Sequence, residues 1–191
     1  MEVKLQSILE EGEQLLWSGR PEPIGTLQGL YKSAILRKIL MIAAGIVILA
    51  GWYISAAVKN GVEVQPIAII VCALPFLYSI YNDFSDAKTL RERTLYAMTD
   101  RRMITVVDKA VSGVEYDKVE GWKVEADADG VVSLVCGCDA LKGKERSRRE
   151  FAVCGARTNL DTGLCESYVM YGITEEADKI AEIAAKYIRA I

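Results

Sequence analysis

The stretch IAAGIVILAGWYISAA, residues 42–57, decides the fold of the first half of the chain. It lies within residues 39–58, which hold no charged side chain, and a second uncharged run follows at residues 64–82. A helix needs about 20 residues to cross about 30 Å of hydrocarbon, so each run is long enough to span a membrane. The alternative is a pair of buried helices in a soluble protein. Such helices normally keep one polar face, and the first run has none.

The composition of the two runs is also typical of membrane helices. Small residues such as Gly45 let helix backbones approach closely, and aromatic residues such as Trp52 lie toward the span ends, where the interface favours them. Acidic residues before the first run and a second run directly after it argue against a cleaved signal peptide. We therefore predict a transmembrane helical hairpin at residues 34–82, with spans at about 39–58 and 64–82.

The charges that flank the hairpin predict its orientation. The connector Lys59–Glu63 is too short for anything except a return, and it carries a single lysine. The basic residues at the outer ends of the hairpin are Lys32, Arg37, Lys38, Lys88, Arg91, Arg93, Arg101 and Arg102. Because basic flanks stay on the cytoplasmic side, we expect a multi-pass protein of the cell membrane with both termini in the cytoplasm.

After the second span, the apolar residues recur mainly with the period of two that is typical of strands. Short runs bounded by turn residues predict strands within residues 95–98, 103–107, 111–119, 122–126, 131–136, 151–154 and 167–171. The intervening residues Thr99–Arg102 are predicted to form a turn. Before the hairpin, residues 4–9 predict a short amphipathic helix with Leu5, Ile8 and Leu9 on one face.

The end of the chain predicts an amphipathic helix at residues 174–191. Thr174 can cap it, and apolar residues then recur at steps of three and four. The sequence therefore predicts an α+β protein with an N-terminal cytoplasmic segment at 1–33, the hairpin at 34–82 and a cytoplasmic domain at 83–191. In that domain we expect one bent antiparallel sheet of about seven strands, with the C-terminal helix capping its open end.

Two motifs carry a family resemblance. Residues 12–21, GEQLLWSGRP, and residues 96–104, YAMTDRRMI, are similar to the opening motif and the strand–turn–strand signature of bacterial pleckstrin-homology-like (PH-like) membrane proteins, the membrane-flanked-domain group. The two spans between them and a final helix introduced by Gly172–Thr174 also fit, although the middle of the domain departs from the pattern. The resemblance implies a PH-like domain held on the membrane, without established catalytic chemistry. A fold of this kind carries no ligand specificity with it.

The basic stretch at residues 142–149 is the main candidate contact with the membrane or a partner. It holds five positive charges against one negative, and each basic residue near an anionic surface contributes about 1 kcal/mol. A solvated loop is the alternative. The full set of candidate contact residues is Lys142, Lys144, Arg146, Arg148, Arg149, Arg101, Arg102 and Trp17. Arg101 and Arg102 are favoured as turn residues near the membrane, and Trp17 is expected at the membrane surface or packed on the domain.

Four cysteines beyond the hairpin raise the alternative of a metal or redox sensor. They are Cys136, Cys138, Cys154 and Cys165. Cys136 and Cys138 lie two apart, which places them on one face of a strand, and zinc accepts four thiolates. The C-x-C spacing differs from that of ordinary zinc sites, and cysteine is a common core residue. We favour structural thiols and predict neither metal nor cofactor.

The remaining composition argues against catalysis and against nucleic acid as a partner. The chain has a net charge of −3 and contains no His, the commonest acid–base group in enzymes. No phosphate-binding or dinucleotide-binding motif occurs. We expect a non-enzymatic membrane protein that presents its domain to proteins, peptides or lipid headgroups. The expected partners are the lipid bilayer, anionic headgroups, and a protein partner or second copy; a structural subunit of a membrane assembly is an alternative.

Overall fold

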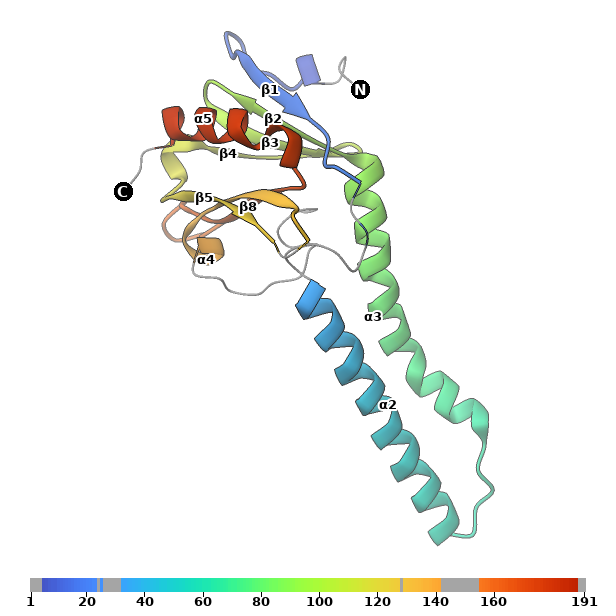
Figure 1. The fold of residues 1–191 in the computed structure, drawn as a ribbon. Helices are drawn as coiled ribbons and strands as arrows, with labels where there is room; N and C mark the ends of the chain where they lie inside the picture. The colour runs from blue at the N-terminus through green and yellow to red at the C-terminus, as the bar shows by residue number, and fades with distance from the viewer. Residues whose placement is uncertain (1–4, 24, 26–31, 128, 142–154, 189–191) are drawn as a thin grey trace.

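The computed structural model describes residues 5–23, 25, 32–127, 129–141 and 155–188. Two long helices extend to one side of a region built from strands and a terminal helix (Figure 1). The elements are β1 (Leu15–Gly19), α2 (Lys32–Lys59), α3 (Pro66–Arg93), β2 (Thr94–Thr99), β3 (Arg102–Val107), β4 (Ala110–Glu115), η1 (Tyr116–Lys118), β5 (Trp122–Ala126), β6 (Val132–Cys136), α4 (Cys138–Leu141), β7 (Arg157–Thr158), β8 (Cys165–Tyr171), η3 (Thr174–Glu176) and α5 (Ala177–Tyr187).

The helices α2 and α3 are both long and apolar enough to cross a membrane. The rest of the described chain buries none of the side chains in their most apolar windows, whereas a soluble protein covers its most apolar helices. α3 begins at Pro66 because Gln65 is extended and proline lacks only an N–H that the first helical turn leaves unbonded. It continues without a break to Arg93, well past the end of the predicted span.

The strands form two antiparallel sheets of four, which corrects the expectation of one seven-stranded sheet. Their orders are β1-β2-β3-β4 and β5-β6-β8-β7. β1 belongs to the first sheet, where it pairs with β2, so the region before the hairpin is part of the same structure as the region after it. The strand expected at residues 151–154 lies outside the described residues.

The break between the sheets comes where a single strand was expected at residues 111–119. β4 ends at Glu115, and the chain turns through η1 so that the side chains of Tyr116 and Val119 enter the core. Gly121 then adopts a φ of +109°, which side chains rarely allow, and the chain departs into β5. Burial of these two apolar residues therefore separates the sheets, a feature that a strand pattern alone does not reveal.

The main core joins both sheets to the terminal helix. Met98 and Met103 of the first sheet, Leu134 and Tyr168 of the second, and Ile180 of α5 are among its fully buried residues. The hydroxyl of Thr105 on β3 donates to the hydroxyl of Tyr168 on β8 at 2.9 Å. The C-terminal helix is confirmed over Ala177–Tyr187, and its apolar face is buried in the core. Thr174 does not cap it as expected, because Thr174 lies in η3 and its hydroxyl accepts a hydrogen bond from the Val132 N–H at 3.2 Å.

The hairpin end of the domain is continuous with the hairpin itself. Ile35 of α2 and Leu90 of α3 are buried in the main core, and α3 passes into β2 at Thr94 with no intervening loop. Lys38 of α2 pairs with Asp83 of α3 at 2.8 Å. These contacts hold the strands in a defined position relative to both helices.

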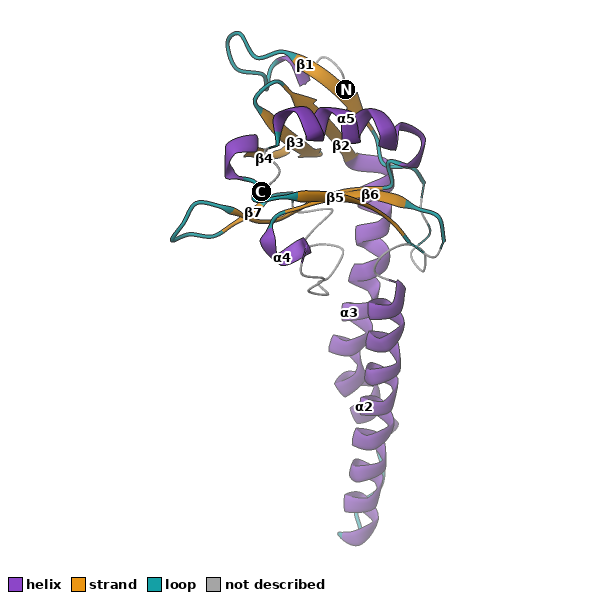
Figure 2. Cartoon of the chain, turned by 60° about the vertical axis from the view of Figure 1, so that its left-hand side comes forward, coloured by secondary structure: helices purple, strands orange, loops and turns teal. Residues whose placement is uncertain are grey.

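The layers of the domain have a clear order along the hairpin direction. Along the hairpin axis, the second sheet lies nearer the connector of the hairpin than the first sheet, which adjoins the end of α3, and α4 lies on the connector-facing side of the second sheet (Figures 1 and 2). At this level Lys32, at the start of α2, forms an ion pair of 3.1 Å with Asp129 in the β5–β6 turn. On the far side, Leu5 is buried against Ala97 and Ile104, with Ile8 and Leu9 packed nearby, as the predicted amphipathic face requires.

Candidate functional site

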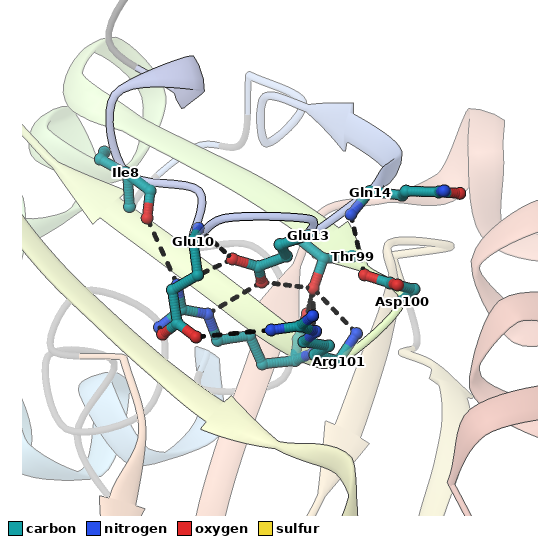
Figure 3. Close-up of polar contacts among 8 residues, drawn as sticks. Ile8, Glu10, Glu13, Gln14, Thr99, Asp100 and Arg101 are labelled. Carbon is teal, nitrogen blue, oxygen red and sulfur yellow. Dashed lines mark hydrogen bonds and ion pairs between the residues drawn. The ribbon is translucent and has the colours of Figure 1, made fainter.

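Two segments that are far apart in the sequence meet where β1 begins. The carboxylate of Glu13 accepts hydrogen bonds from Arg102 Nε at 3.0 Å and Nη2 at 2.9 Å, and from the Thr99 hydroxyl at 2.7 Å. The backbone N–H of Glu10 donates a fourth at 2.8 Å. Glu10, Glu13 and Thr99 converge in Figure 3. The Glu13 side chain is fully covered, and we refer to Glu10, Glu13, Thr99 and Arg102 as the Glu13 cluster.

These contacts hold Glu13 in its charged form. Burial would raise the pKa of the Glu13 carboxyl group, but the hydrogen bonds from Arg102, Glu10 and Thr99 together outweigh it and lower the pKa to about 2. The hydrogen bond to Glu13 in turn raises the pKa of Arg102. A bidentate carboxylate–guanidinium pair is among the strongest polar contacts in proteins. The pair therefore stays ionised at neutral pH and fixes structure.

The β2–β3 turn is fastened to β1 by a second set of hydrogen bonds. The Gln14 backbone N–H donates to Asp100 Oδ1 at 2.9 Å, and the Asp100 N–H donates to the Gln14 carbonyl at 3.0 Å (Figure 3). The Thr99 hydroxyl accepts from the N–H groups of Arg101 at 3.1 Å and Arg102 at 2.9 Å. The two sequence motifs thus form one structural unit, and the predicted turn at residues 99–102 is confirmed.

Trp17 is a core residue, which is the second of the two positions expected for it, since it packs on the domain. Its side chain packs in the main core, and its indole N–H donates to the carboxylate of Glu176 beside α5. Its ring also covers Gly19, where an added Cβ would lie 2.5 Å from a ring carbon. Position 19 therefore requires glycine, because only glycine leaves room for the Trp17 ring.

A pocket of about 800 Å³ opens beside the Glu13 cluster, at the end of β2 away from α3. Its charged lining consists of five carboxylates and two guanidinium groups, from Glu10, Asp100, Glu115, Asp117, Glu120, Arg101 and Arg102. Its remaining lining residues are Tyr116, Val119, Leu164 and Tyr187. We call this site the acidic pocket, since negative charges predominate.

Two aromatic rings form part of the acidic pocket. Tyr116 and Tyr187 stack with their ring centroids 5.4 Å apart, and the Lys186 ammonium lies 5.0 Å from the Tyr187 centroid. The Tyr116 hydroxyl donates to the Thr99 carbonyl at 2.9 Å, which ties the ring to the β2–β3 turn. Burial, followed by the charges of its neighbours, raises the pKa of Tyr116, so its phenol stays neutral.

The basic residues predicted to contact the membrane or a partner differ in their surroundings and in their capacity to bind. Arg102 is held by Glu13 and pairs with Glu10 at 3.1 Å, so it has little capacity left for a partner. Arg101 is half exposed and approaches Glu10 at 3.8 Å. The basic stretch with Lys142, Lys144, Arg146, Arg148 and Arg149 lies outside the described residues. It follows α4, which ends at Leu141 on the hairpin side of the second sheet (Figures 1 and 2).

Cys138 is half-buried at the start of α4 and does not share a strand with Cys136, which ends β6, so the expected common strand face is wrong. Two of the other candidate cysteines are poorly suited to sensing. Cys136 and Cys165 are fully buried. Burial raises the pKa of Cys136 strongly and that of Cys165 to about 12, so both remain neutral thiols of low reactivity. Among the described residues, no group of three or more His, Cys, Asp or Glu side chains is arranged to hold a metal ion. Cys154 lies outside them.

Of the residues that line the acidic pocket, the sequence singled out Arg101 and Arg102 but none of the carboxylates and neither tyrosine. Asp117 and Glu120 belong to a short acidic run, which marks exposure but no particular site. The pairing of Tyr116 with Tyr187 depends on two elements that are far apart in the chain and meet only in the folded core. Glu13 belongs to one of the two sequence motifs and its partner Arg102 to the other, but neither motif indicated the ion pair.

Comparison with known proteins finds no family model, no curated protein and no solved structure that matches this chain. The resemblance to PH-like membrane proteins therefore stays a prediction from the two motifs.

Proposed function

We propose that this chain is a non-enzymatic, multi-pass protein of the cell membrane whose PH-like domain serves as a docking surface at the cytoplasmic face. The hairpin α2–α3 anchors it, and both termini lie in the cytoplasm. The length and apolar surface of the two helices support the anchoring. The basic residues at the outer ends of the hairpin support the orientation.

Two packed antiparallel sheets with a C-terminal helix in their core support the PH-like assignment. The contact between the two motifs also supports the PH-like assignment, because residues 12–21 supply β1 and residues 96–104 supply the turn that holds it. The chain contains no His, and Cys136 and Cys165 are neutral thiols, so the described residues offer little for catalysis. These features favour a docking role over a catalytic one.

The junction between the hairpin and the strands carries this proposal. With Ile35 and Leu90 in the main core and α3 continuous with β2, the domain does not hang on a flexible linker. A domain fixed in this way presents the same face at the same height above the bilayer at all times. Such preorganisation reduces the entropy lost on binding, which favours a docking role.

Photocrosslinking in native membranes tests the docking function. A photoreactive residue at Glu120, in the acidic pocket, is compared with one at Asp178, an exposed residue of α5 that does not line the pocket. We expect discrete crosslinked products from position 120 and none from position 178. Equal patterns from the two positions, or no product from either, contradict a docking surface at the pocket.

Contact between the basic stretch at 142–149 and anionic lipid is a second candidate interaction. It is favoured by the position of α4, which ends at Leu141 on the hairpin side of the second sheet. A fluorophore at Gly143 should be quenched by nitroxide-labelled headgroups more strongly in anionic than in zwitterionic nanodiscs. Equal quenching in the two bilayers contradicts the contact.

A further inference from the structure

The side of the first sheet that faces away from the main core carries a second apolar cluster. Side chains alternate between the two faces of a strand, so Met98 points into the main core while Leu95 and Ala97 point outward. Strand pairing extends this outward face through β3 to β4, where Val106 lies opposite Val111. We call this face the outer patch, and its residues are Leu95, Ala97, Ile104, Val106 and Val111.

One short segment of the same chain covers much of the outer patch. Leu5 is 3% exposed and belongs to this cluster, with Ile8 and Leu9 packed beside it. The N–H groups of Ile8 and Leu9 both donate to the Leu5 carbonyl, at 3.0 and 3.3 Å, so the segment forms one helical turn. Gln6, on the other side of this turn, is exposed. We refer to residues 5–9 as the strap, and its apolar side is the side that contacts the patch.

The strap is fastened less firmly than the strands that it covers. It precedes β1 and belongs to neither sheet, and its apolar cluster is separate from the main core. Its hydrogen bond to the first sheet, from Arg102 Nη2 to the Ile8 carbonyl, is long at 3.3 Å (Figure 3). The next residue, Glu10, is held in the Glu13 cluster, so the strap can open there without loosening β1. Segments with few buried contacts are the ones that open locally in folded proteins.

The β4 side of the outer patch is open. The side chain of Val111 is 48% exposed. Gly113, which lies opposite Ile104, is also exposed and has no side chain to block access. A helix longer than the strap therefore finds further apolar contact on this side, and it can begin to bind before the strap leaves.

The strap shows which kind of partner the outer patch accepts. Helices that bind in grooves use apolar anchors at positions i, i+3 and i+4, and Leu5, Ile8 and Leu9 have this spacing. The strap lies at the end of the molecule opposite the hairpin connector (Figure 1). The patch therefore faces away from the bilayer in which the proposed function anchors the hairpin, which favours a protein helix over lipid.

We propose that the strap is an autoinhibitory cover and that the outer patch binds an amphipathic helix of another protein in its place. The inference goes beyond the proposed function, because it adds a second surface and a means of regulating it. A helix that needs the strap displaced binds with a Kd that is raised in inverse proportion to the open fraction. Variants that release the strap should therefore tighten binding.

A peptide made from the strap tests the inference on the full chain in nanodiscs of zwitterionic lipid. The probe is fluorescein-labelled and consists of two tandem copies of residues 5–11, LQSILEE, and the readout is fluorescence anisotropy. Leu5→Asp should lower the Kd about tenfold, because a carboxylate is expelled from an apolar site and uncovers the patch. The matched control, Gln6→Asp, adds the same charge to the exposed side of the strap and should change the Kd less than about twofold.

Two exposed valines separate binding at the outer patch from general adsorption. In the Leu5→Asp chain, Val111→Asp should raise the Kd about tenfold, whereas Val124→Asp, in the second sheet, should change it less than about twofold. Near-UV circular dichroism reports whether the main core is intact in each variant. The inference is overturned if Leu5→Asp unfolds the main core or leaves the Kd unchanged, or if the two valine variants behave alike. Crosslinking from position 120 tests the docking function separately, so the two failures are distinguishable.

Discussion

The two ends of the first sheet are held by opposite kinds of interaction. At the hairpin end, Leu90 and Ile35 are buried in the core and α3 runs straight into β2. At the pocket end, the Glu13 cluster joins β1 to the β2–β3 turn by charge and hydrogen bonds. The hairpin end is closed mainly by apolar burial, whereas the charged end lies beside a pocket that five carboxylates line. The difference separates the end that joins the hairpin from the end that the proposed function assigns to docking.

The largest effect is expected at the hairpin end. Leu90→Ala removes a side chain that is 2% exposed and should lower the free energy of unfolding of the domain by about 3–5 kcal/mol. Leu77→Ala in the same helix is the matched control, because Leu77 is 52% exposed and should have little effect on the domain. Denaturant unfolding in micelles, followed by near-UV circular dichroism, measures both. Similar losses for the two variants would mean that the helix does not anchor the core.

The next effect should appear at the pocket end. Glu13→Gln leaves Arg102 without its charged partner and should cost about 3 kcal/mol of stability. Glu10→Gln changes an exposed carboxylate in the same cluster and should cost less than about 1 kcal/mol. The same unfolding experiment measures both. If the two losses are equal, the buried pair does not hold β1 in place.

The pH dependence of stability follows from the lowered pKa of Glu13. Because the folded-state pKa is about 2 and the ordinary value is 4.5, the stabilisation is complete above about pH 5 and is lost as the pH falls toward 2. The total is on the order of 3 kcal/mol. The difference in stability between wild type and Glu13→Gln should therefore shrink over this range. A difference that stays constant from pH 6 to pH 2 argues against the ionised pair.

A smaller effect is expected where β1 meets the core. Gly19→Ala places a Cβ 2.5 Å from the Trp17 ring and should cost about 2 kcal/mol, because the ring has to move. Gly45→Ala in α2 is the control, since a Cβ there meets nothing within 4 Å. Thermal unfolding followed by tryptophan fluorescence reports both changes. A neutral Gly19→Ala variant would show that the ring is not confined.

The sequence predicts the hairpin and most elements, because an uncharged run and a period of two are local properties. It does not predict the separation into two sheets, which depends on Tyr116 and Val119 turning into the core after β4. Trp17 also shows that a local pattern does not reveal tertiary neighbours. A tryptophan near a membrane span fits an interfacial position, and only the fold supplies Glu176 and Gly19 as its neighbours.

The acidic pocket could not be recognised as a site from the sequence, for a related reason. Its lining comes from before β1, from the β2–β3 turn, from η1 and from the end of α5. Residues as distant as Glu10 and Tyr187 meet there only through tertiary packing. No window of sequence holds enough of these groups to indicate a site, and the basic stretch at 142–149 gave a stronger local pattern.

Side-specific labelling in intact cells tests the central claim most directly. A reactive handle is placed at Asn60, in the connector of the hairpin, and in a second variant at Glu120, in the acidic pocket. We expect a membrane-impermeant reagent to label position 60 in intact cells and position 120 only after permeabilisation. If both positions react from outside, or neither does, the chain is not a hairpin that holds its docking domain at the cytoplasmic face.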